Sequence, residues 1–375
     1  MNYDSQWIWQ DKSYPNFQFE MEKLEPLLLE IKYYQGLLNG IYLGLNQDSK
    51  LQSKLDVLFY EAMETSAIEG EILSRDSVRS SLLKKLDVSG DNKDSSNIHT
   101  DGLVDLLLDA SRNNHEPLTL NRIFGWHNSL FPTGFSGLHK INVASFRGME
   151  PMQIVSGPIG REKVHYIAPA HEQLNSEMEK FINYVNDNEN LSIIKAGIAH
   201  LWFVIIHPLD DGNGRIARAI TDMLLTRESK LDYMLYSLSN AIMADKKSYY
   251  EILEQTTKGG MDISLWLNWF LNTILNAQKT ARDNINHVLE KTRFWDRHKS
   301  TVLNARQIKV LERLLNTGKG MFTGGINTRK YASLAKTSKP TASRELKDLV
   351  EKGCLQQRTG TAGRNVSYDL SLPLP

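Results

Sequence analysis

The segment from residue 191 to residue 225 constrains the fold of this chain more than any other. Residues 191–206, LSIIKAGIAHLWFVII, have the composition of an apolar helix, and residues 217–225, ARAITDMLL, that of a second one. Residues 207–218, HPLDDGNGRIAR, combine a histidine, two carboxylates, a Gly-Asn-Gly turn and two arginines. We therefore expect a polar loop that joins two helices and opens onto the N-terminus of the second.

A loop of this kind favours anions, because the first N–H groups of a helix lack intrahelical partners and the helix dipole attracts negative charge. Gly212 and Gly214 would let the backbone approach a pyrophosphate closely, and Asn213 would donate its side-chain amide. Arg215 and Arg218 lie three residues apart, so both side chains would reach phosphate oxygens. The pattern indicates group transfer from a nucleotide.

The same loop offers a base and a metal ligand. An imidazole such as His207 is the usual group to take a proton from a hydroxyl nucleophile, and Asp211 is an oxygen ligand for magnesium. From the residues alone, a packed helix-end histidine followed by an ordinary turn remains an alternative. The spacing lacks the alternate acids of a calcium-binding EF-hand loop, and no GK[ST] follows, as it would in a Walker loop.

The motif resembles the signature of the Fic (Fido) family, HxFx[DE]GNGRxxR, with Leu209 in place of the usual phenylalanine. The resemblance implies a mainly α fold with a helical core and a small β-hairpin flap. It implies a nucleotidyltransferase, a protein adenylyltransferase that moves AMP from ATP to a Tyr, Thr or Ser hydroxyl of a protein and releases pyrophosphate, with Mg²⁺ as cofactor. The phosphate-binding loop leaves UMP or phosphocholine open as the transferred group.

The resemblance also assigns roles to the loop residues. His207 becomes the general base, Asp211 the metal ligand and Arg218 the partner of the γ-phosphate. The residues that would contact the nucleotide in and after the loop are Gly212, Asn213, Gly214, Arg215, Ile216, Ala217 and Arg218.

A second match to the family lies far upstream. Residues 51–71 carry apolar residues at helical spacing, and residues 65–70, TSAIEG, match the inhibitory pattern [ST]xxxE[GN]. The resemblance implies that Glu69 pairs with Arg218, which then cannot bind the γ-phosphate. A glutamate in the last turn of a helix is otherwise a solvated charge. Two roles stay open for Glu69: restraint of AMP transfer, or orientation of a water that removes AMP from the target.

Residues 141–170 predict a β-hairpin, with two short strands about a turn at Ser156-Gly157-Pro158. The segment resembles the Fic flap, at about 147–168, whose edge would bind an extended target segment by strand addition. An ordinary surface hairpin is the alternative. The docking residues expected from the resemblance are Met152, Gln153, Ile154 and Val155.

Residues 237–259 predict a single helix with two adjacent tyrosines. The resemblance makes Tyr250, and with less support Tyr249, contacts of the adenine base. Neighbouring aromatic residues on a helix are more often part of the core.

The C-terminal end is a distinct basic module. The net charge of the chain is zero, but residues 291–369 hold 17 Lys and Arg against 6 Asp and Glu, a net of +11. Three predicted helices, at 305–316, 327–337 and 339–353, precede a strand pair at 354–370, which resembles a winged helix-turn-helix. It would bind DNA, or dock a protein. The residues expected to face the DNA are Thr341, Ser343, Arg344 and Lys347, with Arg358 and Arg364 near phosphates.

Composition sets the remaining expectations. The 375 residues exceed one typical domain, and the single Cys354 excludes an internal disulfide, which suits a reducing compartment. No uncharged apolar run reaches 18 residues and the N-terminus lacks a signal-peptide pattern, so we expect a cytoplasmic protein without a membrane span.

Three mainly helical parts are predicted. Residues 1–97 form an N-terminal subdomain with the inhibitory helix at 51–70, residues 98–290 a Fic core, and residues 291–375 the winged helix-turn-helix, with a polar loop at 87–97. The first hypothesis is an adenylyltransferase, able also to modify itself. The alternative is a DNA-binding regulator whose Fic core senses a nucleotide. The expected partners are a target protein, DNA and a second copy of the chain.

Overall fold

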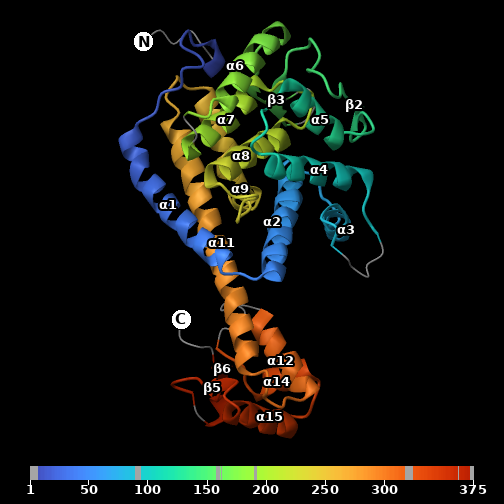
Figure 1. Cartoon of the computed structure of the whole chain (residues 1–375), viewed down its shortest axis with the longest axis vertical. Coiled ribbons are helices and arrows are strands. Elements are labelled where there is room, and N and C mark those ends of the chain that lie inside the picture. Colours follow the sequence, from blue (N-terminus) through green and yellow to red (C-terminus); the bar gives the residue numbers. More distant parts are fainter. Residues whose placement is uncertain are drawn as a thin grey trace. The chain divides into compact units, whose positions relative to one another are not determined.

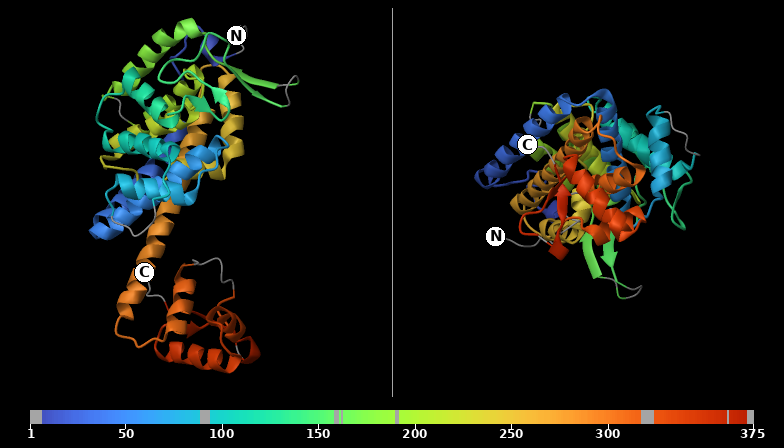
Figure 2. Two further views of the ribbon diagram at one scale, coloured as in Figure 1. Left: turned by 90° about the vertical axis from the view of Figure 1, so that its right-hand side faces the viewer. Right: turned by 90° about the horizontal axis from the view of Figure 1, so that it is seen from below.

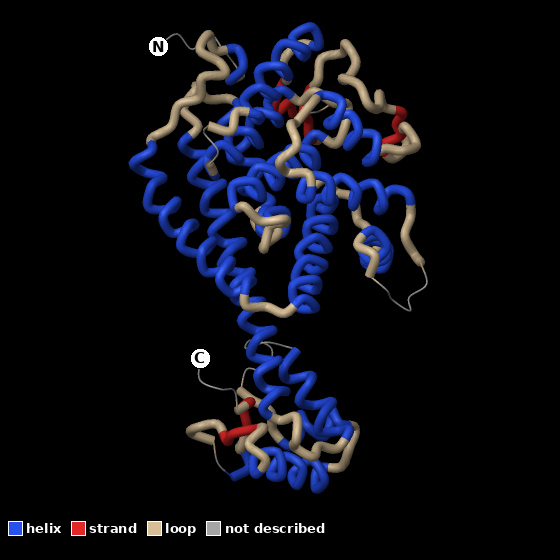
Figure 3. The backbone as a smooth tube through the Cα atoms, viewed as in Figure 1, coloured by secondary structure: helices blue, strands red, loops and turns tan. Residues whose placement is uncertain are grey.

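The protein is mainly helical, as predicted, and its described strands form only three short antiparallel pairs (Figures 1 and 3). The computed structural model describes residues 7–371 except 89–93, 158–160, 162, 190–191, 317–323 and 362. Two compact units make up the chain, Met1–Ala281 and Arg282–Pro375. Among the described helices, none has the length and apolar character needed to cross a bilayer.

Most of the secondary structure belongs to the first unit. Its helices are η1 (Ile8–Gln10), α1 (Met21–Leu43), α2 (Gln47–Ile68), α3 (Arg75–Lys85), α4 (Ile98–Arg112), α5 (Leu120–Leu130), η2 (His171–Gln173), α6 (Leu174–Asn186), α7 (Ile193–Ile206), α8 (Asn213–Ser229), α9 (Leu238–Ala244), α10 (Lys246–Thr257) and α11 (Ser264–Arg297), which extends past this unit. Its strand pairs are β1 (Phe135–Ser136) with β2 (His139–Lys140), and β3 (Gln153–Ser156) with β4 (Lys163–Ile167).

Helix α7 is the centre of the first unit, because every one of its residues is buried. A helix without a polar face needs neighbours on all sides. At Gly197 a Cβ atom would lie 2.7 Å from the ring of Phe270, so only glycine permits the close approach of α11. Both ring nitrogens of the buried His200 have hydrogen-bond partners. Nδ1 lies 3.0 Å from the hydroxyl of Thr221, and Nε2 lies 3.0 Å from the hydroxyl of Tyr249.

The predicted single helix at 237–259 is wrong, because the structure divides it into α9 and α10 at Asp245. Asp245 leaves the helical region, with φ −130° and ψ 39°, and its carboxylate accepts a hydrogen bond from the indole of Trp269 at 3.3 Å. A short polar side chain that competes for local hydrogen bonds is typical of a helix boundary.

The second unit contains the end of α11, the helices α12 (Ala305–Asn316), α14 (Thr328–Ala335) and α15 (Lys339–Glu351), the short η3 (Gly363–Asn365), and a hairpin of β5 (Leu355–Gln357) and β6 (Tyr368–Leu370). Its core includes Phe294, Leu311 and Leu346. The buried Glu345 accepts from the Tyr331 hydroxyl at 2.9 Å and pairs with Arg306 at 2.5 Å. The identification as a winged helix-turn-helix stays a prediction.

Parts of three expected features lie outside the described residues. They are Pro158 of the hairpin turn, residues 89–93 of the polar loop and the side chain of Arg364.

Replacing Gly102 by alanine tests the packing of α4 against α5. A Cβ atom there would lie 1.8 Å from the backbone oxygen of Ser129, so we expect Gly102→Ala to lower the free energy of unfolding by about 1–3 kcal/mol. In the control Gly125→Ala, no heavy atom lies within 4 Å of the added methyl group. The control should gain about 0.5–1 kcal/mol from helix propensity. Urea unfolding measures both; equal stability of the two variants would contradict the close approach.

Candidate active site

His207 ends helix α7 in a left-handed conformation, with φ 49° and ψ 56°. A non-glycine residue in this region costs about 1 kcal/mol or more. Its Nδ1 lies 3.2 Å from the carbonyl oxygen of Val204, which only accepts, so Nδ1 carries the proton and Nε2 is the basic atom. Burial is the main cause that lowers the pKa of His207, which keeps the imidazole neutral at pH 7. The ring is therefore prepared to take a proton.

The N-terminus of α8 follows the loop directly. Gly212 has φ 81°, and its oxygen accepts the first intrahelical bond, from the N–H of Ile216 at 3.0 Å. The N–H groups of residues 213–215 precede that bond and are the free donors of the helix end. Ile216 and Ala217 were expected to contact a nucleotide, but both side chains are fully buried, because they belong to the core face of α8.

Asn213 has a different role from the expected one. Its amide nitrogen donates to the carbonyl oxygen of Leu209 at 2.8 Å, and its amide oxygen accepts from the N–H of Leu209 at 3.0 Å. Both ends of the side chain are used within the loop, and the residue is buried. Asn213 thus fixes the loop in this structure, and its contact with a phosphate stays a prediction.

Arg218 is held by the end of helix α2. Its Nη2 donates to Oε1 of Glu69 at 2.7 Å and to the backbone oxygen of Thr65 at 2.9 Å, while Nε donates to the Thr65 hydroxyl at 2.7 Å. The arginine is 1% exposed. Burial, the largest single cause, lowers the pKa of Arg218, but the Glu69 carboxylate together with Tyr249 and Tyr250 raises it, and the net shift is upward. The contact between Glu69 and Arg218 that the sequence pattern predicts is present.

The carboxylate of Glu69 lies against the first turn of α8. A Cβ atom built on Gly214 would be 2.1 Å from Glu69 Oε1, so the side-chain space of Gly214 is filled by this oxygen. Helix N-termini bind carboxylates and phosphates by the same donors and dipole. Glu69 therefore occupies the position where the loop is suited to bind an anion.

Arg215 holds a second carboxylate that the sequence reasoning missed. Its Nη1 donates to Oε2 of Glu71 at 2.9 Å, and its guanidinium lies 4.9 Å from the centroid of the Phe131 ring. The two motif arginines were expected to reach toward the same phosphates, but each binds a different glutamate. Arg218 binds Glu69, and Arg215 binds Glu71. No motif includes Glu71; its only signal is a position two residues after Glu69.

The two aspartates of the loop differ in their surroundings. Asp210 accepts from the N–H of Asn142 at 2.7 Å and from the N–H of Gly148 at 3.2 Å, so it ties the loop to the segment before the hairpin. Asp211 accepts from the hydroxyl of Ser136 and keeps 39% of its side chain exposed. Mg²⁺ typically binds one or two carboxylates together with substrate phosphates and waters, and one exposed carboxylate beside a helix N-terminus fits that pattern.

The two tyrosines of α10 also differ. Tyr249 was expected to contact adenine, but it is 2% exposed and its hydroxyl bonds to His200, so it belongs to the core. The Tyr250 hydroxyl donates to the backbone oxygen of Ile68 at 3.1 Å, and Nζ of Lys246 lies 3.2 Å from the oxygen of Ala67. Helix α10 thus holds the end of α2. A contact of Tyr250 with adenine stays a prediction.

The predicted hairpin is present as β3 and β4 and projects from the body of the first unit (Figure 2, left). Gln153 pairs with Ile167 and Ile154 with Tyr166, and a β-bulge follows Ile154. All four residues of β3 are exposed. Glu254 of α10 holds the other strand through Nδ1 of His165 at 2.7 Å. A cleft of about 710 Å³ beside the hairpin is lined by Asn142, Arg147, Met152, Gln153, Val155 and Asp210, among others.

The expected DNA contacts lie on helix α15. Arg344 and Lys347 are exposed, and Thr341 and Ser343 are half-buried. The helix begins at Lys339, after Ser338, whose hydroxyl accepts from the N–H of Thr341 at 3.3 Å.

Residues 117–225, which include the whole loop, match the sequence model of the Fic/DOC family. This part of the chain is therefore similar to the Fic/DOC family. Residues 7–88, with α1, α2 and α3, match a second family described as a domain of unknown function (DUF4172).

Similar curated proteins are named as protein adenylyltransferases. The protein adenylyltransferase Fic of Nematostella vectensis is 33% identical over 97 residues, 25% of this chain and 21% of that protein. That of Drosophila ananassae is 23% identical over 231 residues, 57% of this chain and 43% of that protein. The chain thus spans less than half the length of these relatives.

Solved structures share the fold. A Fic family protein from Desulfovibrio desulfuricans is 15% identical and matches over 92% of this chain and 96% of its own, with a TM-score of 0.50. Fic-1 of Caenorhabditis elegans is 18% identical over 71% of this chain and 74% of its own, with a TM-score of 0.51. At these identities the likeness concerns the fold alone.

Two buried histidines next to the site predict acid sensitivity. Burial lowers the pKa of His127 to about 4 and that of His200 to about 3, against about 6.5 in an unfolded chain. Below pH 6.5 these histidines bind protons in the unfolded chain but not in the folded chain. The free energy of unfolding therefore decreases as the pH is lowered. From pH 7 to 5.5 each histidine should lower the free energy of unfolding by about 1 kcal/mol.

Urea unfolding at the two pH values measures this loss. His200→Gln should flatten the pH dependence, whereas the control His115→Gln, at an exposed position, should not. The same slope in wild type and His200→Gln would refute the assignment.

Proposed function

We propose that this protein transfers AMP from ATP to a hydroxyl side chain of a target protein. The observation that carries the proposal is the juxtaposition of a neutral His207 and the N–H groups without intrahelical partners at the start of α8, within the segment that matches the Fic/DOC family. The relatives named as protein adenylyltransferases support the same reaction, although the chain spans less than half their length.

In the proposed reaction the target hydroxyl loses its proton to Nε2 of His207 and its oxygen attacks the α-phosphorus. The bond from that phosphorus to the bridging oxygen of the β-phosphate breaks, and pyrophosphate leaves. The N–H groups of residues 213–215 would stabilise charge on the phosphates, as positioned donors do in phosphoryl transfer. Asp211 would hold Mg²⁺, which neutralises phosphate charge when bound.

Glu69 would restrain this reaction. While its carboxylate holds Arg218 and covers Gly214, neither the guanidinium nor the end of α8 is free for the phosphates. If the closed state is favoured by about 2–3 kcal/mol, productive ATP binding falls roughly 30- to 150-fold. Release of Glu69 restores the site. The second role open for this carboxylate, orientation of a water that cleaves AMP from the target, uses the same position.

The restraint is tested with α-labelled ATP and Mg²⁺. We expect Glu69→Gly to raise transfer of label to protein, to the chain itself or to an added extract, by roughly 30- to 150-fold, because Arg218 becomes free. Glu71→Gln, which leaves the Glu69–Arg218 pair intact, should raise it far less. The double variant Glu69→Gly with His207→Ala should transfer no label.

Each result decides one element of the proposal. Transfer that persists without His207 would remove it as the base. An equal gain from Glu71→Gln would show that restraint does not act through Arg218. Loss of label from a modified protein, faster in wild type than in Glu69→Gly, would favour AMP removal.

A second function is proposed for the C-terminal unit, binding of duplex DNA through α15. The exposed Arg344 and Lys347 and the net charge of +11 over residues 291–369 support it. It would act beside AMP transfer, or be the main function of a regulator that senses nucleotide.

Titration of the full chain with mixed-sequence duplex DNA at 50 and 200 mM salt tests the DNA proposal. The double change Arg344→Ala and Lys347→Ala should weaken DNA binding. It should also make the dependence of log affinity on log salt concentration shallower by about two, the number expected for the loss of two phosphate contacts. The matched control replaces the exposed Lys12 and Lys247 of the first unit by alanine, and should bind as the wild type does. Equal affinity of all three proteins would exclude α15 as the contact.

A further inference from the structure

Arg147 is a buried arginine that the reaction scheme does not use. It precedes the β3–β4 hairpin and is 1% exposed, one of the largest fully buried side chains of the described chain. A buried guanidinium is normally retained where several acceptors need a fixed donor. Its partners therefore indicate what it does.

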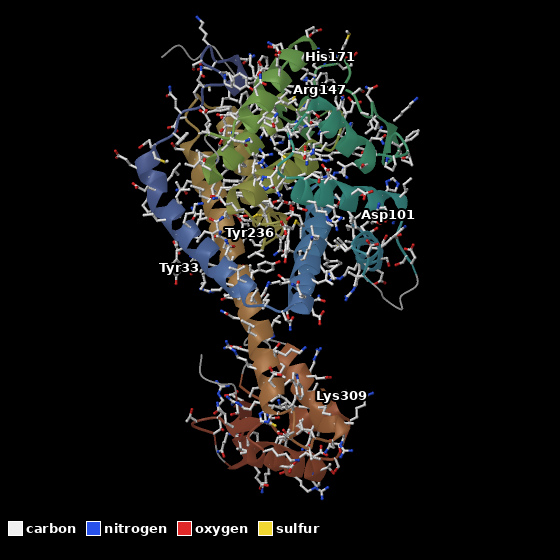
Figure 4. All side chains as sticks on the ribbon, viewed as in Figure 1. Tyr33, Asp101, Arg147, His171, Tyr236 and Lys309 are labelled. Atoms are coloured by element: carbon white, nitrogen blue, oxygen red, sulfur yellow. The ribbon has the colours of Figure 1, made fainter. Side chains whose placement is uncertain are left out.

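The partners of Arg147 join the base to the hairpin. Its Nε donates to the carbonyl oxygen of His207 at 2.9 Å, and its backbone N–H donates to that of Pro208 at 2.9 Å. Its Nη2 donates to the carbonyl oxygen of Pro169, just after β4. The carbonyl oxygen of Arg147 in turn accepts from Nδ1 of His171 at 2.7 Å, and Figure 4 shows both side chains at one end of the first unit.

These bonds act on the one residue of the loop whose backbone is strained. His207 has a φ of 49°, and the direction of its carbonyl group depends on that conformation. A donor that is itself fixed by burial holds the carbonyl in place. Because the ring of His207 is bonded to Val204 at the same turn, the position of Nε2 follows from the backbone that Arg147 fixes.

We propose that Arg147 is a positioning residue that sets the orientation of the His207 imidazole and links it to the seating of the β3–β4 hairpin. Its consequence for catalysis depends on the proposed AMP transfer. The positioning itself does not depend on it.

The charge of Arg147 gives the proposal a second, independent consequence. The charged groups that act on the His207 ring are Arg147, Glu69 and Asp211; Arg147 lowers its pKa, and the two carboxylates raise it. Removing the arginine charge while keeping the carboxylates must therefore raise the pKa of His207. A residue that served only to fill space would have no such effect.

Arg147 also lines the cleft beside the hairpin, together with Met152, Gln153 and Val155. One guanidinium thus contacts the loop of the base, and its buried residue borders the cleft along which an extended segment would lie. The guanidinium of Arg147 donates to the carbonyl oxygens of His207 and Pro169. A shift of the hairpin would move the carbonyl group of Pro169 and thereby the guanidinium that also holds His207. Occupation of the cleft and orientation of the base are thereby connected.

Histidine NMR on the full chain tests the positioning without any activity. The ¹⁵N-labelled wild type, Arg147→Gln and Arg147→Lys are titrated from pH 8 to 5, and the His207 signals are assigned from their absence in His207→Gln. We expect the His207 pKa to rise by at least half a unit in Arg147→Gln, with a mixture of ring tautomers. In Arg147→Lys, which keeps the charge, the pKa should stay within 0.2 units of wild type.

Arg227→Gln is the matched control, because Arg227 is another buried arginine that donates to backbone oxygens, those of Asn114 and Glu116. It should lose stability without moving the His207 signals. An unchanged His207 pKa and tautomer in Arg147→Gln, with a loss of stability like that of Arg227→Gln, would overturn the proposal.

Kinetics in the Glu69→Gly background provide the second arm. Arg147→Lys should lower kcat for AMP transfer at least fivefold with KM for ATP unchanged, since lysine cannot bond to both carbonyl groups in the same geometry. If Arg147→Lys has the same kcat as its Glu69→Gly parent, the positioning role is contradicted. This test remains valid even if Arg147→Gln does not fold. If the Glu69→Gly parent itself transfers nothing, the proposed function fails, and the NMR titration still decides the role of Arg147.

Discussion

The free N–H groups at the start of α8 are the physical constraint around which the site is arranged. They cannot be satisfied within the helix, and the helix dipole adds positive potential in front of them. The chain supplies its own anion, because Glu69 projects from the end of α2 onto Gly214 and Arg218. A second carboxylate, Glu71, binds Arg215. The helix end therefore carries an intramolecular ligand of the same charge as the phosphates that it is suited to bind.

The extent to which the sequence predicted the site follows from the range of the interactions. Short local patterns located His207, the glycines and Glu69, because the spacing of a loop and the end of a helix are encoded within a few residues. The use of Asn213 was not predictable from those patterns, since an amide beside a phosphate site and an amide bonded to Leu209 have the same sequence. Tyr249 is similar: only the fold shows that it meets His200 rather than a ligand. Glu71 and Arg147 carry no motif, and the contacts of Glu71 with Arg215 and of Arg147 with His207 join residues more than 50 positions apart.

The same reasoning applies to the fold. The apolar segment of α7 predicted a buried helix because its composition leaves no polar face. The break at Asp245 was missed; the carboxylate there bonds to Trp269, 24 residues away, which no local pattern shows. The hairpin was anticipated from its Gly-Pro turn, but its attachment to α10 through Glu254 and His165 is tertiary. As a result α10 touches both the end of α2 and the hairpin, which places the proposed restraint and the proposed docking edge on one helix.

Gly214 has a consequence for how the activity of such a protein can change in evolution. The space of its absent side chain is used by the Glu69 carboxylate, and a phosphate at the same helix end would need that space as well. A larger residue at this position would expel both ligands, so constitutive activity cannot arise from a change there. Under the proposed restraint it would arise where the two ligands differ, as in the segment that carries Glu69. The proposed regulation and chemistry could thus diverge through mutations in α2 and its C-terminal residues, while position 214 of the loop stays restricted to glycine.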